Sequence, residues 1–308
     1  MIVTLAGGGG GAKLANGLAQ MLPPGELTIV VNTGDDFEHL GLAISPDIDS
    51  VIYALAGLND RERGWGQRDE SWAFMDALKR IGGEDWFLLG DRDLATHVVR
   101  SEMLRTGQTL SEVTAELAHR LGVAQTIVPM SDDPVRSVIE TDEGDLPFQH
   151  YFVRRRCEPR FAGIRFEGVE QARIAPAAAE AIDSEALEAI VICPSNPVLS
   201  IAPILAVPSI ADRLRARRVP AVAVSPFIGG QAVKGPAAKI MAELGLVPSA
   251  AAIAHQYEGL IDGLVIDRAD EADALPCAVR ATDTLMRNEA DQARLAREVL
   301  DFARSLKR

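Results

Sequence analysis

Five consecutive glycines near the N-terminus constrain this chain more than any other feature. An apolar segment, residues 2–5, precedes them, and a helical pattern follows in which apolar side chains recur three or four positions apart. A strand, a glycine run and a helix in this order direct backbone N–H groups and the positive helix end toward an anion. We therefore predict a phosphate-binding loop; the alternative is a tight strand-to-helix turn without a ligand. The glycines are Gly7, Gly8, Gly9, Gly10 and Gly11.

The residues around the glycines exclude one familiar nucleotide site. A nucleotide-hydrolase P-loop has a second glycine before its lysine and a Ser or Thr after it, whose hydroxyl holds magnesium. In this chain Ala12 precedes Lys13 and Leu14 follows it. Gly7, Gly9 and Ala12 do satisfy the dinucleotide pattern G-x-G-x-x-G/A, which leaves an NAD-dependent oxidoreductase open as an alternative.

Carboxylates follow the second predicted strand, residues 27–31. Asp35 and Asp36 come soon after it, and Asp47 and Asp49 complete a set of four acids within fifteen residues. Ligands of an open parallel sheet gather at the carboxyl ends of its strands, so these acids should face the same crevice as the glycines. Carboxylates combined with phosphate oxygens suit magnesium. The alternative is a solvated acidic loop in which Asp49 or the next residue caps a helix.

Short apolar, β-branched runs recur along the chain and end in polar, turn-forming residues, as the strands of a parallel sheet do. We therefore predict an α/β fold with a doubly wound, mostly parallel, Rossmann-like sheet. The expected strands are residues 2–5, 27–31, 125–129, 190–193, 221–224 and 264–267. The expected helices include residues 289–307 and Ala-rich segments near 172–189 and 249–254.

A region that is not part of this sheet is expected between its second and later strands. Residues 51–122 carry mainly helical periodicity, and residues 137–140 and 148–153 flank a turn and indicate a β-hairpin. We expect a single α/β domain with this region inserted into it. The expected boundaries are 1–308 for the domain, 1–50 and 123–308 for its core, and about 51–122 for the helical insertion.

The composition excludes some classes of binding partner and indicates the cell compartment. A net charge of −13 argues against nucleic-acid binding, which needs a basic face, and against attachment to anionic membranes. Cys157, Cys193 and Cys277 are too few and too scattered for a disulfide framework or a zinc site. No apolar run approaches the roughly 20 residues of a membrane span, and the N-terminus does not resemble a signal peptide. We expect a cytoplasmic protein that acts on small-molecule substrates.

Taken together, the motifs resemble those of the 2-phospho-L-lactate transferase family (CofD-like), which makes the phosphodiester of coenzyme F420. They are AGGGGGAK, NTGDD, SPDIDS, RGWGQRDE, LGDRDLATH, SDD, PSNP and SPFIGGQAVKGP, in this order over nearly the whole chain. LGDRDLATH and the last block are the specific ones. The glycine loop and PSNP are also similar to a related family of sugar-nucleotide-binding regulatory proteins. The family usually has Thr or Val where this chain has Gly9, which removes any hydroxyl contact from the loop.

The resemblance implies a magnesium-dependent phosphotransferase that is usually a homodimer. Its donor is a phospho-acid carried as a guanylyl diphosphate, such as lactyl-2-diphospho-5′-guanosine. The ribityl 5′-hydroxyl of the deazaflavin Fo attacks the acid-side phosphorus and GMP leaves, which gives a coenzyme F420-0 type product. The acid is 2-phospholactate, enolpyruvyl phosphate or phosphoglycerate. The alternative is a non-catalytic nucleotide-sugar-binding regulator of the related family.

The resemblance also implies roles for individual residues. Asp36 and Asp47 would hold Mg²⁺, with Asp35 and Asp49 as second-choice ligands or orienting groups. Lys13 would offset the diphosphate charge, and Asp36 is also the candidate general base. A wall that holds Fo or the acid would comprise Asp91, Arg92, Thr96 and His97, although His97 alone is compatible with a structural role. The guanylyl part would contact Ser195, Asn196, Ser225, Gly229, Gly230 and Lys234.

Overall fold

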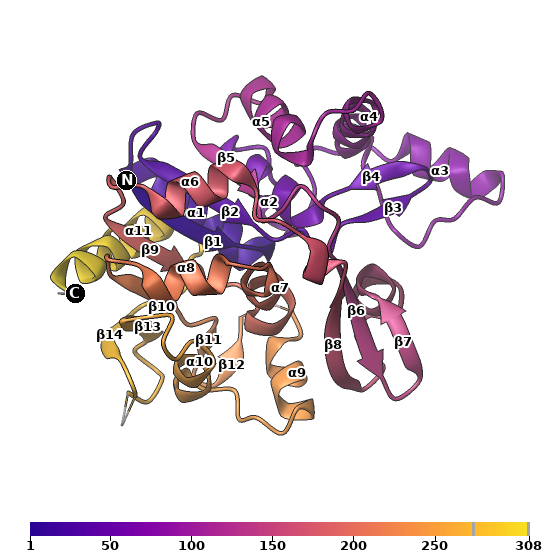
Figure 1. Cartoon of the computed structure of the whole chain (residues 1–308). Coiled ribbons are helices and arrows are strands. Elements are labelled where there is room, and N and C mark those ends of the chain that lie inside the picture. The colour runs from indigo at the N-terminus through magenta and orange to yellow at the C-terminus, as the bar shows by residue number, and fades with distance from the viewer. Residues whose placement is uncertain (234, 273–274, 307–308) are drawn as a thin grey trace.

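The computed structural model describes residues 1–233, 235–272 and 275–306. Its centre is a seven-stranded parallel sheet in the order β14-β13-β10-β9-β1-β2-β5 (Figure 1). From β1 the chain adds β2 and β5 on one side, then returns and adds β9, β10, β13 and β14 on the other. The strand order therefore reverses between β1 and β9, the position where open α/β sheets bind ligands. The predicted doubly wound fold is confirmed.

All the predicted strands of this sheet are present, and one strand was missed. The strand bounds are β1 (Ile2–Ala6), β2 (Leu27–Val31), β5 (Thr126–Pro129), β9 (Ala189–Ile192), β10 (Ala221–Val224), β13 (Gly263–Asp267) and β14 (Ala278–Thr282). The missed strand, β14, lies at the sheet edge and is mostly exposed. An exposed edge strand needs no continuous apolar run, so hydrophobic periodicity does not reveal it.

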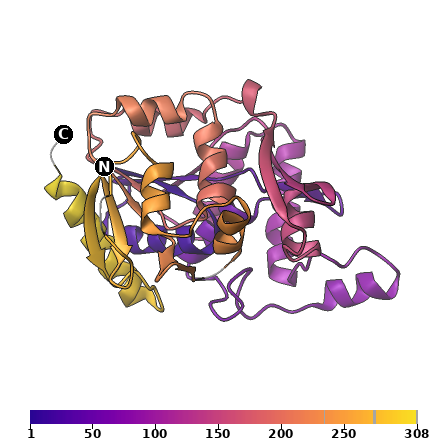
Figure 2. The same cartoon turned by 90° about the horizontal axis from the view of Figure 1, so that it is seen from below.

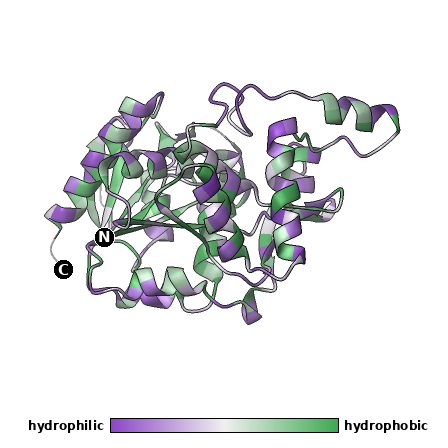
Figure 3. Cartoon of the chain, turned by 90° about the horizontal axis from the view of Figure 1, so that it is seen from above, coloured by the Kyte–Doolittle hydropathy of each residue, from purple (hydrophilic) through white to green (hydrophobic). Residues whose placement is uncertain are grey.

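Helices cover both faces of the sheet, and the strands are buried between them (Figure 3). Within β1, Ile2 and Ala6 pack into one hydrophobic cluster and Val3 and Leu5 into the other, as the two-residue period of a strand requires. The first face carries α1 (Gly8–Met21), α2 (Pro46–Leu55), α5 (Leu110–Arg120) and α11 (Glu289–Ser305). The second carries α6 (Pro176–Asp183), α7 (Ala202–Ala206), α8 (Ile210–Ala216), α9 (Ala237–Glu243) and α10 (Ala250–Gln256).

The segment between β2 and β5 contains both sheet-packed and protruding elements. A hairpin of β3 (Phe37–His39) and β4 (Leu42–Ile44) leads into α2, and α4 (Asp91–Arg105) follows α3 (Ala73–Arg80). Helix α3 extends away from the body of the molecule (Figures 1 and 2). By contrast, α2 and α5 supply core residues to the sheet face, so the helical region is only partly separate from the core.

The predicted hairpin is wrong in its second strand. Strand β6 (Arg136–Thr141) pairs with β7 (Gly144–Pro147) and β8 (Phe161–Glu167), whereas residues 150–154 form a π-helical turn, η1. Phe148 and Tyr151 are buried together three positions apart while Phe152 is exposed, which is helical rather than alternating burial. The remaining short elements are η2 (Val169–Gln171), η3 (Pro197–Ile201), β11 (Phe227–Ile228) and β12 (Gln231–Ala232).

No single helix within the described residues is long and apolar enough to cross a membrane. One bent pair, Pro197–Ala206 followed by Ile210–Ala216, meets the criterion by length and composition alone. Ile204, Ile210 and Leu214 of this pair belong to the hydrophobic cluster on the second face of the sheet.

Candidate active site

The glycine run forms the start of α1 rather than a separate loop. Gly7 is the N-cap residue and the helix begins at Gly8, whose φ of +63° favours glycine. The Gly7 N–H donates to Ser195 Oγ (3.1 Å), and the Gly8 N–H donates to Asp47 Oδ1 (2.6 Å). Helix geometry leaves the N–H groups of Gly9 and Gly10 without intrahelical acceptors. These two groups can therefore bind an anion at the positive end of α1.

The glycines differ in how much space surrounds them. A Cβ at Gly7 would lie 2.5 Å from Asp47 Oδ2, and one at Gly11 would lie 2.5 Å from Ser195 Oγ. A Cβ at Gly10 would clash with the carbonyl oxygen of Pro194. At Gly9, by contrast, the nearest atom would be 4.0 Å away. Close packing therefore explains three of the glycines, whereas Gly9 has room for a side chain.

Three carboxylates at the end of β2 and the start of α2 form what we call the open acid group: Asp35, Asp36 and Asp47. All three are buried and form no ion pair within the described residues. The amide of Asn32 joins two of them, since its Nδ2 donates to Asp47 Oδ2 (2.9 Å) and to Asp35 Oδ1 (3.3 Å). Asp36 Oδ2 accepts a hydrogen bond from Ser45 Oγ (2.8 Å). Its other oxygen, Oδ1, is buried with no partner among the described residues.

The open acid group resists ionisation. Burial raises the pKa of Asp36 to about 7, although Arg136 and the Ser45 hydroxyl favour its ionised form. Burial also raises the pKa of Asp47 to about 6, against the hydrogen bonds from Asn32 and the Gly8 N–H. Burial, followed by repulsion from Asp47 and Asp36, raises the pKa of Asp35 well above its usual range. Buried carboxylates of this kind are stabilised by a cation.

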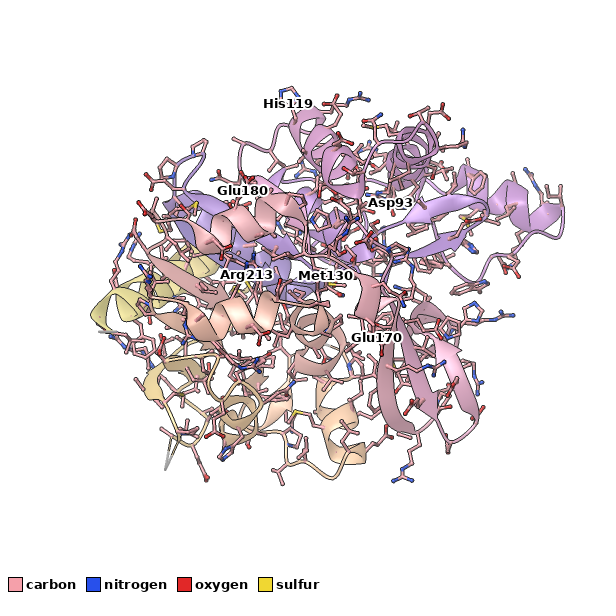
Figure 4. All side chains as sticks on the ribbon, in the orientation of Figure 1. Asp93, His119, Met130, Glu170, Glu180 and Arg213 are labelled. Atoms are coloured by element: carbon pink, nitrogen blue, oxygen red, sulfur yellow. The ribbon has the colours of Figure 1, made fainter. Side chains whose placement is uncertain are left out.

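A second buried set, the paired acid group, consists of Asp49 and Asp93 with His97 and Arg100. Arg100 is 1% exposed and donates from both guanidinium ends to Asp49. Its Nη1 also lies 3.1 Å from His97 Nδ1, and His97 Nε2 lies 3.4 Å from Asp93 Oδ2. Asp93, labelled in Figure 4, accepts a further hydrogen bond from Tyr53 (2.7 Å). Asp49, Asp93 and His97 are close enough to hold a metal, but Arg100 already balances the Asp49 charge.

The four residues of the predicted wall have different surroundings in the structure. Asp91 is engaged by the protein itself: its carboxylate accepts hydrogen bonds from Ser71 Oγ and from the N–H groups that begin α3. Arg92 is exposed, and its Nη1 donates to the Arg68 carbonyl (3.3 Å). Thr96 and His97 are buried on the inner side of α4. Of the four, His97 belongs to the paired acid group, and Thr96 contacts Tyr53 beside it.

The predicted guanylyl contacts follow two neighbouring strands, β9 and β10. Ser195 directly supports the glycine run, whereas Asn196 caps η3 by accepting from Val198 N and Leu199 N (both 3.0 Å). Ser225 Oγ accepts from Phe227 N (3.2 Å), and β10 is separated from β1 by β9. Gly229 and Gly230 have φ values of +57° and +73° in the turn between β11 and β12. Lys234 lies outside the described residues.

Lys13, which was predicted to offset the diphosphate charge, contacts the segment before α11, and three further residues that the sequence did not single out adjoin the open acid group. Lys13 Nζ donates to the Met286 carbonyl (3.1 Å), which ties α1 to the segment before α11. Asn32 and Ser45 orient the open acid group, and both lie in motifs that the sequence did highlight. Arg136 was missed because it follows a different strand, and only the folded sheet brings it near Asp36.

Comparison with known proteins decides the family. A family model described as 2-phospho-L-lactate transferase CofD matches residues 2–303. The chain belongs to the CofD family. A 2-phospho-L-lactate transferase of Methanosarcina mazei is 40% identical over 304 residues, covering 97% of this chain and 99% of the relative. A phosphoenolpyruvate transferase of Streptomyces griseus is 41% identical over 317 residues, covering 99% of each.

A solved structure supports the fold of this CofD family member. A protein of the UPF0052 family from Bacillus halodurans superposes with a TM-score of 0.63 over 97% of this chain and 98% of its own. The two are 16% identical, so the likeness concerns the fold alone. The CofD match places the chain in a transferase family of coenzyme F420 biosynthesis, as the motifs predicted. It also removes the oxidoreductase alternative.

Proposed function

We propose that this protein transfers a phospho-acid from a guanylyl-diphosphate donor to the 5′-hydroxyl of Fo, with Mg²⁺ as the cofactor. The observation that carries the proposal is the open acid group beside the N-terminus of α1. Phosphoryl transfer requires mainly positioning and neutralisation of charge, and this arrangement offers anion-binding N–H groups next to cation-binding carboxylates. The names of the relatives, which cover two different acids, support the reaction class.

The residues of the open acid group fit Mg²⁺. Asp36 Oδ1 is a buried acceptor without a partner, and neither Asp36 nor Asp47 forms an ion pair within the described residues. Magnesium prefers a few carboxylate oxygens combined with phosphate oxygens. Asp36 and Asp47 would hold the ion, and Asp35 is the second-choice ligand. Asp49 is paired with Arg100 instead. When bound, the ion would neutralise the developing charge on the diphosphate.

The chain's own groups have separable tasks in this reaction. The N–H groups of Gly9 and Gly10 would hold a phosphate at the positive end of α1. A bond forms between the 5′-oxygen of Fo and the acid-side phosphorus as the bond to the GMP oxygen breaks. The hydroxyl proton would pass to Asp36, a buried carboxylate with one unpartnered oxygen. Asn32 and Ser45 would keep the two carboxylates in place.

The test is a turnover assay on the purified full chain. Fo, Mg²⁺ and guanylyl-activated lactate, enolpyruvate or glycerate are supplied in turn, and GMP and the mass of the deazaflavin product are measured. We expect stoichiometric GMP and a more anionic deazaflavin with at least one donor. Absence of product with all three donors would overturn the proposal, and nucleotide-sugar binding without turnover would favour the regulatory alternative. We also propose a homodimer, which light scattering of the eluting protein would test.

A further inference from the structure

A hollow of about 130 Å³ adjoins the open acid group and is lined in part by Asp36, Ser45 and Arg136. It lies between the end of β2, the β3–β4 hairpin, the segment joining α4 and α5, and residues 132–136. This volume is well above the roughly 10 to 15 Å³ that one water molecule needs, so the hollow has room for a small ligand. Because Asp36 lines both the hollow and the proposed reaction site, a group in the hollow could be joined to the reacting phosphorus.

The polar groups of the hollow differ in whether the protein satisfies them. Asp132 accepts from Ser111 N (2.7 Å) at the start of α5, and Asp133 accepts from the N–H of Arg173 (2.9 Å). In contrast, Thr33 Oγ1 is buried without a partner among the described residues, and Thr33 is less than one-tenth exposed. Asp36 Oδ1 is also unpartnered, and it is the oxygen assigned above to the metal. Unsatisfied buried groups of this kind are costly unless a ligand or water completes them.

Arg136 supplies the positive charge of the hollow. Its Nη1 donates to the Val135 carbonyl (2.9 Å), and it forms no ion pair within the part of the chain that the structure describes. A guanidinium presents a planar fork of donors that matches a carboxylate. The remaining lining includes the apolar side chains of Phe37, Ile44 and Leu104. The hollow therefore combines a carboxylate-binding group with an apolar wall.

We propose that this hollow binds the acid part of the transferred group, with its carboxylate on Arg136 and its third carbon against Phe37 and Leu104. Thr33 is the hydroxyl placed to hydrogen-bond the bound acid. This inference rests on the proposed function and specifies its donor. A methyl or methylene group fits the apolar wall, whereas a hydroxymethyl group brings a hydroxyl that the wall does not satisfy. Lactyl and enolpyruvyl donors should therefore be preferred to glyceryl donors by about 10- to 100-fold in kcat/KM.

The first test separates acid recognition from the rest of the reaction. In Arg136→Gln the KM for the acid donor should rise about 10- to 100-fold, as expected for loss of a charged hydrogen bond, while the KM for Fo changes less than about twofold. Arg136→Lys keeps the positive charge but loses the planar fork of donors. Its KM for the acid donor should therefore lie between that of the wild type and that of Arg136→Gln. Arg165→Gln, an exposed arginine on β8, is the matched control. An unchanged donor KM in Arg136→Gln, or an equal rise for Fo, would overturn the inference.

Calorimetry keeps the inference testable even without turnover. Free 2-phospholactate, phosphoenolpyruvate and 2-phosphoglycerate are titrated into the wild-type protein and Arg136→Gln, each with Mg²⁺. We expect the first two acids to bind wild type more tightly than the third, and the variant to lose at least tenfold in affinity. Equal affinities for wild type and Arg136→Gln, or no binding of any acid, would contradict the acid subsite. Failure of turnover with intact, Arg136-dependent binding would instead contradict only the proposed transfer reaction.

A third variant tests the apolar wall. Leu104→Ser places a hydroxyl at the position that faces the third carbon of the acid in this proposal. The ratio of kcat/KM for the glyceryl donor to that for the lactyl donor should increase by about tenfold, and the same ratio of affinities should increase in calorimetry. An unchanged ratio in a variant that remains folded by circular dichroism would place the third carbon elsewhere.

Discussion

The open and paired acid groups lie a few residues apart in the sequence but differ in what balances their charge. Asp47 and Asp49 both lie in the first turn of α2. Asp49 points to Arg100 of α4, which neutralises it inside the protein. Asp47 points to the Gly8 N–H and the Asn32 amide, which are neutral donors. One turn of helix thus supplies a carboxylate to the scaffold and another to the proposed reaction site.

The charge that balances a buried carboxylate distinguishes ligand-binding acids from structural ones. A carboxylate with its own guanidinium has little to gain from a metal, because binding the metal would release a buried arginine. A buried carboxylate that accepts hydrogen bonds only from neutral donors is not fully compensated for the loss of its hydration. A bound cation can offset the remaining cost. On this argument we expect Asp36 and Asp47, rather than Asp49, to bind the metal of the proposed reaction.

The largest expected effect is on turnover. Asp36→Asn should lower kcat by about 10³-fold, or roughly 4 kcal/mol, because the open group loses its charge and its proton acceptor. Asp49→Asn should lower kcat less than about tenfold at a temperature where it is folded, since its role is to hold Arg100. Steady-state kinetics with saturating Fo and Mg²⁺ measure both, with the exposed Asp76→Asn as the control. Equal losses in Asp36→Asn and Asp49→Asn would erase the distinction between the groups.

Substitutions in the paired acid group should lower stability more than substitutions in the open acid group. Arg100→Gln leaves Asp49 buried without its cation and should cost about 3 to 5 kcal/mol of unfolding free energy. The double variant Arg100→Met with Asp49→Leu removes both charges and should recover most of that loss. Urea denaturation of the metal-free protein measures these values. If Arg100→Gln unfolds at the wild-type urea midpoint, the paired group is not the scaffold element argued above.

The sequence predicted the open group better than the paired one, for a physical reason. Gly7, Asp36 and Asp47 lie at strand ends or in the adjacent helix, and parallel strands bring their carboxyl ends to one edge whatever the loops do. The partner of Asp49 is 51 residues away on α4, and that contact depends on how α4 docks, which periodicity does not determine. Arg136 was missed for the same reason.

Local patterns also failed where tertiary packing decided the structure. Phe148 to Val153 alternates too weakly to separate a strand from a helical turn, and burial of Tyr151 against Phe161 favours the turn. Asp91 was predicted to be a site residue because it lies in a charged motif. The sequence did not reveal that its carboxylate accepts a hydrogen bond at the start of α3, from the N–H of Ala73 eighteen residues earlier, because only the fold creates this contact.

The pH dependence of stability should also distinguish the groups. Folding raises the pKa of Asp36 to about 7 and that of Asp47 to about 6, so the folded state binds more protons than the unfolded state above about pH 4. Unfolding free energy from these groups therefore falls as pH rises toward 7, by roughly 3 to 4 kcal/mol for each. Asp36→Asn should become more stable than the wild type by an amount that grows from pH 5 to pH 8.

Denaturation at pH 5, 6.5 and 8 in the presence of a chelator measures this difference. Asp76→Asn should follow the wild type at every pH. Adding Mg²⁺ should stabilise the wild type more at pH 8 than at pH 6, because the ion displaces protons from the open group, and should stabilise Asp36→Asn much less. A stability difference between Asp36→Asn and wild type that does not change with pH would contradict the burial of an uncompensated carboxylate.

The smallest effect concerns the glycines at the end of α1 that faces the open group. The Cβ of Gly9→Ala would come no closer than 4.0 Å to the Gly64 carbonyl oxygen, and the change replaces a helical glycine, so it should raise stability by about 0.5 to 1 kcal/mol. Gly10→Ala meets the Pro194 carbonyl and should destabilise by about 1 to 3 kcal/mol. Thermal denaturation of the two variants compares them directly. Because only the backbone of Gly9 is proposed to bind phosphate, Gly9→Ala should keep kcat within about threefold of wild type, and a larger loss would mean that the ligand occupies the space beside its Cα.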